Sequence, residues 1–148
     1  MKKLLLALAV VVAAPAVWAD VWINPGFYSY HFDKEKNLNN NNHGLGFEAS
    51  ISHTYSITAG VFENSNRKTS HYIGAYVMPF QLGAVKAGVA VGGFDGYPNM
   101  RDGGWFPAVL PVMAIEGPRL GMNVSYTPKI GDKLNSALSF QVKFKIAP

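Results

Sequence analysis

Few side chains in this sequence could carry out nucleophilic or acid–base chemistry. The 148 residues include no cysteine, which excludes a thiol nucleophile, a disulfide framework and a thiolate metal site. The four histidines lack the spacing of metal ligands, so we predict neither a bound metal nor a cofactor. His31 remains as a candidate general base. Asn64 and Ser65, which follow one another in the sequence, offer an amide and a hydroxyl.

Each of these candidates also has an ordinary structural interpretation. His31 could be a polar residue at the rim of the fold, and Asn64 with Ser65 could begin a turn, where both residue types are common. The choice depends on the elements that position the three side chains.

Residues 1–19 are predicted to be a secretory signal peptide. Two lysines precede an apolar run over residues 4–14, and small residues provide a cleavage site after Ala19. The run is too short for a helix that crosses a membrane. Residues 20–148 contain no linker or break in composition, so we predict one exported domain.

The charge of the chain gives no indication of a nucleic-acid partner. The net charge is +4, and removal of the two lysines of the predicted signal peptide leaves +2. No block of basic residues is interleaved with aromatic residues. Scattered surface charge explains this composition, and we predict no binding of nucleic acid.

Hydrophobic residues in the exported part alternate with small or polar residues, which is the period of β-strands. Residues 27–32 place three aromatic side chains on one face, whereas residues 70–78 and 106–115 are apolar on both faces. No helical period of 3.6 is sustained anywhere. Five further segments alternate clearly, namely residues 44–52, 55–61, 85–92, 119–126 and 137–144.

The connections between these eight expected strands alternate in length. The short ones are residues 53–54, 79–83 and 116–118. The long, polar ones are residues 33–43, 64–69, 95–105 and 128–135. Long loops outside and tight turns on the periplasmic side are typical of bacterial outer-membrane barrels.

The two faces of the strands distinguish a membrane barrel from a soluble, lipocalin-like one. A soluble barrel fills its interior with large apolar residues and covers its outside with charges. Here the second face is rich in Gly, Ser and Ala, which suits a narrow lumen, while the Leu, Val, Phe and Tyr face suits lipid. We therefore predict an all-β, eight-stranded antiparallel up-and-down transmembrane β-barrel in a bacterial outer membrane, with Trp22 among its interface anchors.

Two groups of residues resemble motifs of the outer-membrane lipid A palmitoyltransferase (PagP) family. Residues 31–36 (HFDKEK) and 44–47 (GLGF) resemble the family's first long loop and second strand. Residues 62–68 (FENSNRK) and 73–76 (IGAY) are similar to the segment that bears its catalytic Asp-Ser pair.

Prolines extend this resemblance, which covers about residues 28–144. Pro107 and Pro111 lie within an expected strand and Pro128 ends another, although proline removes a hydrogen bond from a strand ladder. They resemble the family's strand prolines, which open lateral gaps in the barrel wall for lipid. The resemblance therefore implies a lateral gate at these three residues.

The resemblance implies a monomeric enzyme that moves an acyl chain from a membrane phospholipid to lipid A. Its catalytic residues would be His31, Asn64 and Ser65, which would meet at the extracellular rim. Asn64 stands where the family has an Asp, so it cannot act as a carboxylate. The family's histidine aligns near Phe27, and His31 lies four residues later on the same face.

Two residues are predicted to bind substrate. Tyr76 aligns near the family's pocket floor, so if it points inward the pocket is shallower and the preferred acyl chain shorter. Arg101, in a long outer loop, could bind a phosphate or sugar of lipid A, although a solvated glycine-rich loop also explains that segment.

Two other functions remain open at this point. One is a non-enzymatic barrel, structural or for surface exclusion, that has the scaffold without the Asp. The other is a lipid A deacylase, which would need a His and a Ser two residues apart on a late strand. Asn123 and Ser125 have that spacing but no histidine accompanies them.

Overall fold

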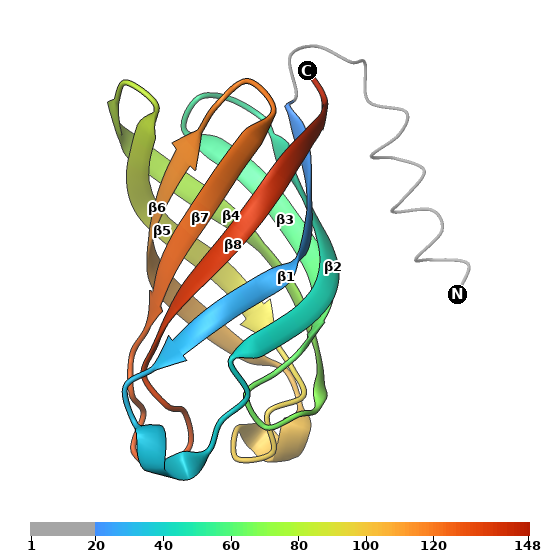
Figure 1. Ribbon diagram of the computed structural model, residues 1–148, viewed down its shortest axis with the longest axis vertical. Coiled ribbons are helices and arrows are strands. Elements are labelled where there is room, and N and C mark those ends of the chain that lie inside the picture. The colour runs from blue at the N-terminus through green and yellow to red at the C-terminus, as the bar shows by residue number, and fades with distance from the viewer. Residues whose placement is uncertain (1–19) are drawn as a thin grey trace, which may run out of the picture.

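Eight antiparallel strands form a closed barrel in the computed structural model, which describes residues 20–148 (Figure 1). Each strand pairs with the next along the chain, and the last pairs with the first. The strands are β1 (Val21–His31), β2 (Asn41–Ser50), β3 (Tyr55–Glu63), β4 (Thr69–Leu82), β5 (Val85–Phe94), β6 (Phe106–Glu116), β7 (Leu120–Thr127) and β8 (Ala137–Ala147). The predicted all-β, eight-stranded up-and-down barrel is confirmed, while the predicted signal peptide lies outside the described residues.

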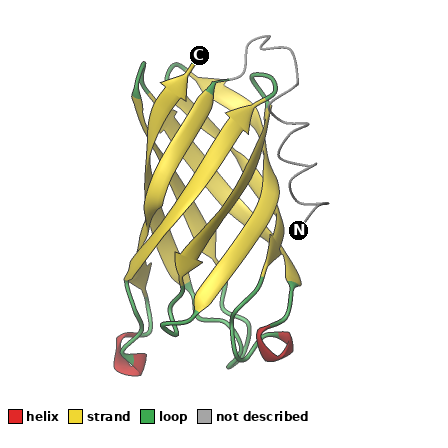
Figure 2. Cartoon of the chain, turned by 90° about the vertical axis from the view of Figure 1, so that its right-hand side faces the viewer, coloured by secondary structure: helices red, strands yellow, loops and turns green. Residues whose placement is uncertain are grey.

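The two ends of the barrel differ, as Figure 2 shows. Short turns join strands at the end where the C-terminus lies, which we call the turn end. Long connections at the opposite, loop end carry two short 3-10 helices, η1 (Lys34–Lys36) and η2 (Arg101–Gly103). The predicted alternation of long and short connections is therefore present.

No helix among residues 20–148 is long and apolar enough to cross a lipid bilayer.

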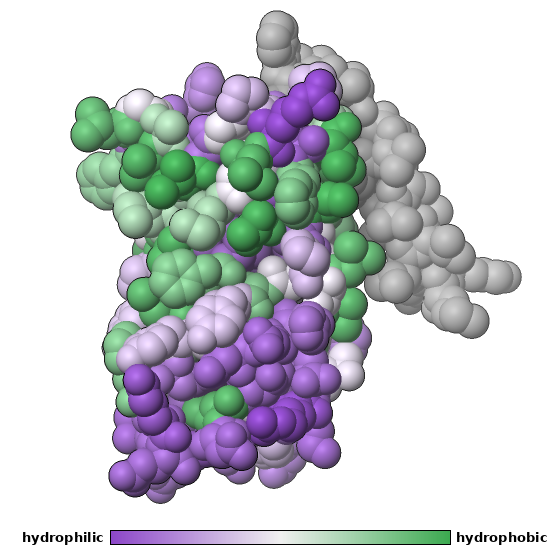
Figure 3. Space-filling model, in the orientation of Figure 1, coloured by the Kyte–Doolittle hydropathy of each residue, from purple (hydrophilic) through white to green (hydrophobic). Residues whose placement is uncertain are grey.

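The large apolar side chains of most strands point away from the lumen. Leu45, Ile73 and Phe144 are exposed examples from three different strands. Figure 3 shows a hydrophobic band over the strands and a hydrophilic surface at the loop end. The predicted apolar outer face is therefore present on most strands, whereas the predicted small or polar lining does not extend through the loop-end half of the lumen.

An irregularity at Pro25 and Gly26 changes which residues of β1 point inward. The register between β1 and β2 shifts between Asn24 and Gly26. Gly26 has a backbone φ of 100°, a value that residues other than glycine rarely adopt. In a regular strand, residues 22 and 31 would point to opposite faces, because they are an odd number of residues apart. Across this bulge Trp22 and His31 both point inward. The prediction of Trp22 as an interface anchor is wrong, since it is 1% exposed inside the lumen.

Aromatic rings fill the loop-end half of the lumen, which the sequence pattern did not predict. Phe62 contacts Phe27, with ring centroids 4.7 Å apart, and Tyr72, at 5.9 Å. Phe94 stacks on Phe106 at 6.1 Å. A Cβ at Gly60 would overlap the Tyr72 ring, so any larger residue there would force that ring to shift.

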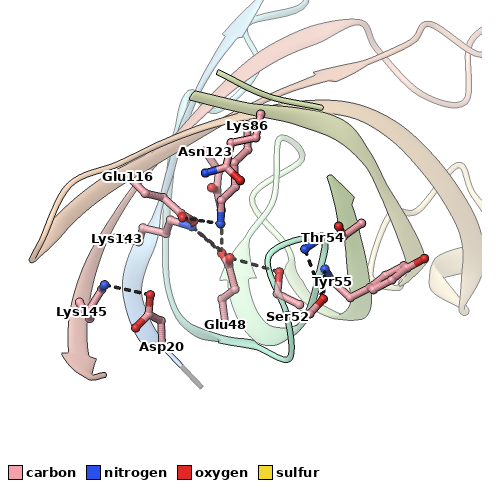
Figure 4. Close-up of polar contacts among 12 residues, drawn as sticks. Asp20, Glu48, Ser52, Thr54, Tyr55, Lys86, Glu116, Asn123, Lys143 and Lys145 are labelled. Atoms are coloured by element: carbon pink, nitrogen blue, oxygen red, sulfur yellow. Dashed lines mark hydrogen bonds and ion pairs between the residues drawn. The ribbon is translucent and has the colours of Figure 1, made fainter. Parts of the chain in front are cut away.

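Charged side chains fill the turn-end half of the lumen (Figure 4). Lys143, 1% exposed, lies 3.0 Å from Glu48 Oε1 and 2.6 Å from Glu116 Oε1. Glu116 also pairs with Lys86 at 2.9 Å, and Asn123 donates to Glu48 Oε2 at 3.0 Å. We call this network the lumen floor. It gives each buried charge a partner of opposite charge and closes the interior on the turn-end side of the aromatic rings.

Candidate active site at the loop end

His31, the last residue of β1, contacts two side chains from other parts of the loop end. Its Nε2 lies 2.8 Å from Ser65 Oγ, and its Nδ1 lies 2.7 Å from Asn40 Oδ1. We call these three residues the rim array. The predicted meeting of His31 with Ser65 is present, and Asn40 is an additional member. A hydroxyl, an imidazole and an orienting oxygen in series are the parts of a nucleophile activated by a base.

The asparagine-rich segment of residues 37–42 positions the rim array. Ser29 N donates to Asn40 O at 2.8 Å, and Asn39 N donates to Ser65 O at 2.9 Å. Ser29 Oγ donates to Asn42 Oδ1 at 2.6 Å, and Asn42 Nδ2 donates to the last carbonyl of β3 at 2.8 Å. The segment predicted as a polar loop therefore fixes the backbones that carry His31 and Ser65.

Asn64 supports the turn that carries Ser65 and does not reach the rim array. Its side chain is fully buried, and its Oδ1 accepts hydrogen bonds from the backbone N–H groups of Asn66 at 2.9 Å and Lys68 at 3.1 Å. Its Nδ2 donates to Ser70 Oγ and to the Gly96 carbonyl, both at 2.8 Å. Both amide hydrogens are thus committed, and the expected catalytic role of Asn64 is not supported by its contacts.

These contacts predict the effect of Asn64→Asp, which would place a carboxylate at this position. A carboxylate has no hydrogen to donate, so one of its oxygens would face the Gly96 carbonyl without a proton between them. We expect the variant to lose about 1–3 kcal/mol of unfolding free energy and to gain no activity. Denaturant unfolding measures the loss, and Asn41→Asp, at an exposed asparagine, is the matched control. Higher activity with unchanged stability would contradict this assignment.

A cavity leads from the rim array into the lumen. The volume of this cavity is about 130 Å³. Phe62, Phe106 and Leu110 are among its apolar lining residues, and Tyr76 lines it at the level of the buried Met78 cluster. At the loop end, burial raises the pKa of the Tyr97 hydroxyl, another lining group, above its usual range.

The prolines predicted as a lateral gate lie beside an interruption in the strand ladder. β6 pairs with β7 only from Val112 to Glu116, whereas its first six residues have partners on β5 alone. Pro107 and Pro111 are both in this part of β6, and Pro128 directly follows the last residue of β7. In the loop-end half of the barrel wall, β6 and β7 are therefore not joined by a ladder of backbone hydrogen bonds.

The two predicted substrate-binding residues lie in different places. Tyr76 points inward and lines the cavity. An inward Tyr76 is the orientation for which the sequence predicts a shallower pocket. Arg101 lies in the exposed β5–β6 connection, where its Nη1 donates to Trp105 O at 3.4 Å, and it does not line the cavity. Among residues 20–148, no group of three or more metal-ligating side chains lies together.

Asn40 is the functional candidate that sequence reasoning missed. Even-numbered residues of β2, such as Asn42 and Glu48, point into the lumen, and Asn40 continues that alternation just before the strand. The same period that placed His31 on the lumen face could therefore have placed Asn40 beside it. The six-residue asparagine-rich run concealed this signal by its resemblance to an ordinary loop.

No protein-family model and no curated protein matches this chain. The barrel and the geometry of the rim array are therefore the features of the chain that indicate its function.

Proposed function

We propose that the protein is a monomeric outer-membrane acyltransferase that moves an acyl chain from a phospholipid to a hydroxyl of lipid A. The observation that carries this proposal is the position of the rim array at the mouth of a cavity with apolar lining. A base beside a hydroxyl can break and form esters, and an apolar cavity can hold the acyl chain during the transfer.

The outer surface supports a location in the membrane. A hydrophobic band surrounds the strands on the face that Figure 3 shows, and continuous apolar surface of this kind would be unfavourable in water. The closed barrel pairs its strands all the way around, as a membrane requires, and leaves strand backbone unpaired only where β6 and β7 separate. The loop end would then face the outside of the cell and carry the rim array in the outer leaflet, where lipid A lies.

The interrupted ladder supports entry of a lipid from the side. A lipid cannot pass through a wall closed by backbone hydrogen bonds, but β6 and β7 lack these bonds next to Pro107 and Pro111. The gap opens at the level of the cavity, since Leu110 of β6 and Thr127 of β7, which have no partner across the gap, both line the cavity. An acyl chain could enter there while its headgroup stays at the membrane surface.

Expression in a bacterium that lacks such an enzyme tests the proposal. Membrane fractionation and heat-dependent migration on a detergent gel report the location and the barrel, and mass spectrometry of lipid A reports the reaction. We expect a folded barrel in the outer membrane and a new lipid A species heavier by one acyl chain. A folded barrel with unchanged lipid A would favour the non-enzymatic alternative, and a lipid A that loses an acyl chain would favour a deacylase.

Tyr76 predicts the length of the transferred chain. Because its ring occupies the inner part of the cavity, the wild type should transfer a chain shorter than palmitate. Tyr76→Ala should deepen the cavity and shift the lipid A product to longer chains, as read by mass spectrometry. Tyr28→Ala, which removes an exposed ring from the outer face of β1, is the control and should leave the distribution unchanged. Addition of full palmitate by the wild type would contradict the prediction.

A further inference from the structure

The hydrogen bonds of the rim array define the proton positions on His31. Asn40 Oδ1 can only accept, so the 2.7 Å contact places a hydrogen on His31 Nδ1. In the neutral imidazole Nε2 then carries the lone pair, and Ser65 Oγ, 2.8 Å away, is placed to donate its hydrogen to it. The base is thus directed at the serine of this chain rather than at an open position for an acceptor hydroxyl.

A donor for the negative charge of a tetrahedral intermediate lies next to this serine. The Asn66 side chain lines the same cavity and makes no hydrogen bond to another residue of the described part. Its backbone N–H is already used, since it donates to Asn64 Oδ1 at 2.9 Å. The side-chain amide, one residue after Ser65 and in the same cavity lining, is therefore the candidate we assign as oxyanion donor, a kind of group that contributes strongly to catalysis.

From these contacts we propose that Ser65 is a nucleophile that carries the acyl chain as a covalent ester between the two halves of the reaction. The inference rests on the proposed function for the identity of the acyl donor, a phospholipid ester. His31 acts as the base, Asn66 as the oxyanion donor, and Asn40 as a positioning residue for His31.

The first half-reaction forms the acyl-serine. Ser65 Oγ attacks the ester carbonyl carbon while its proton moves to His31 Nε2. The bond from that carbon to the glycerol oxygen then breaks, and the oxygen takes the proton from His31. A lysophospholipid leaves, and the acyl chain stays on Ser65.

The second half-reaction transfers the chain and restores the enzyme. His31 Nε2 takes the proton of an acceptor hydroxyl, whose oxygen attacks the acyl-serine carbonyl. The bond to Ser65 Oγ breaks, and Oγ recovers the proton. Each half exchanges one ester for another with no change of oxidation state, so no further reactant is needed.

A fluorophosphonate with a long alkyl chain tests for the nucleophile in the purified, detergent-solubilised protein. We expect the intact mass to rise by one adduct, peptide mapping to place it on Ser65, and Ser65→Ala to remain unlabelled. A p-nitrophenyl fatty-acid ester should release a burst of about one p-nitrophenolate per enzyme and leave the acyl group on Ser65. Heat-dependent gel migration verifies that each variant is folded.

The role of Asn40 is separated from a structural one by two substitutions. Asn40→Leu should slow labelling at least about 100-fold because His31 loses the partner that orients it. Asn40→Asp should keep labelling, and the acid limb of its pH profile should move to higher pH because the new carboxylate stabilises protonated His31. Equal loss in both folded variants would overturn the positioning role.

The two proposals fail in distinguishable ways. Acylation of lipid A by the wild type and by folded Ser65→Ala, with no adduct on Ser65, would overturn the covalent intermediate and leave the proposed function standing. An adduct on Ser65 without any change in lipid A would keep the nucleophile and overturn the proposed acceptor.

Discussion

Replacement of Ser65 or His31 by alanine is expected to lower the rate of lipid A acylation by at least about 1,000-fold. In a base–hydroxyl pair, either loss removes the function of both groups, because the hydroxyl keeps its proton without the base and the base has no hydroxyl to activate. The 2.8 Å contact between Ser65 Oγ and His31 Nε2 places the two residues in such a pair. Initial rates with purified protein and defined phospholipid donors measure the effect.

The control for this experiment is a histidine of the same barrel outside the rim array. His43 is exposed on β2, and His43→Ala should retain the activity of the wild type. The double variant of Ser65 and His31 should be no slower than either single variant, since residues that act as a unit are not additive. Full activity in folded His31→Ala would contradict the assignment of the base.

The strands and their faces were predictable because a barrel imposes period two on nearly every residue. The segments from Leu45 to Ala49 and from Tyr55 to Val61 alternate without interruption and have the faces that were predicted, although β2 ends at Ser50, before the predicted strand end at residue 52. The pairing of His31 with Ser65 also followed, because antiparallel strands bring alternate ends together at one rim. Local sequence and topology agree in these regions.

The remaining features depend on irregularities that a period cannot encode. The bulge at Pro25 and Gly26 reverses the inward face of β1, and the reversal hides Trp22 inside the lumen. The role of Asn64 depends on the Gly96 carbonyl, which comes from a connection 32 residues away in the chain. Asn40 was missed because its neighbours are also asparagines and its contact with His31 requires the loop to be folded.

The cavity needs a closed inner end, and the lumen floor provides it with charge rather than with apolar packing. On the turn-end side of Tyr76, the carboxylates of Glu48 and Glu116 both pair with the ammonium group of Lys143. Buried charges of this kind are tolerated only when each has a partner. The chain thus combines an apolar cavity near the loop end with a polar, fully paired barrier near the turn end.

Lys143→Met is therefore expected to lower the free energy of unfolding by about 3–5 kcal/mol, because it leaves Glu48 buried without a cation. Tryptophan fluorescence during denaturant unfolding in lipid vesicles measures the loss, and Trp22 is a local reporter since Lys143 Nζ lies 4.7 Å from its ring. Lys145→Met removes a partly exposed pair with Asp20 and should cost less than about 1 kcal/mol. Adding Glu48→Gln to Lys143→Met should recover part of the loss, because it removes the unpaired charge. Equal, small losses for both lysines would show that the barrel closes without the floor.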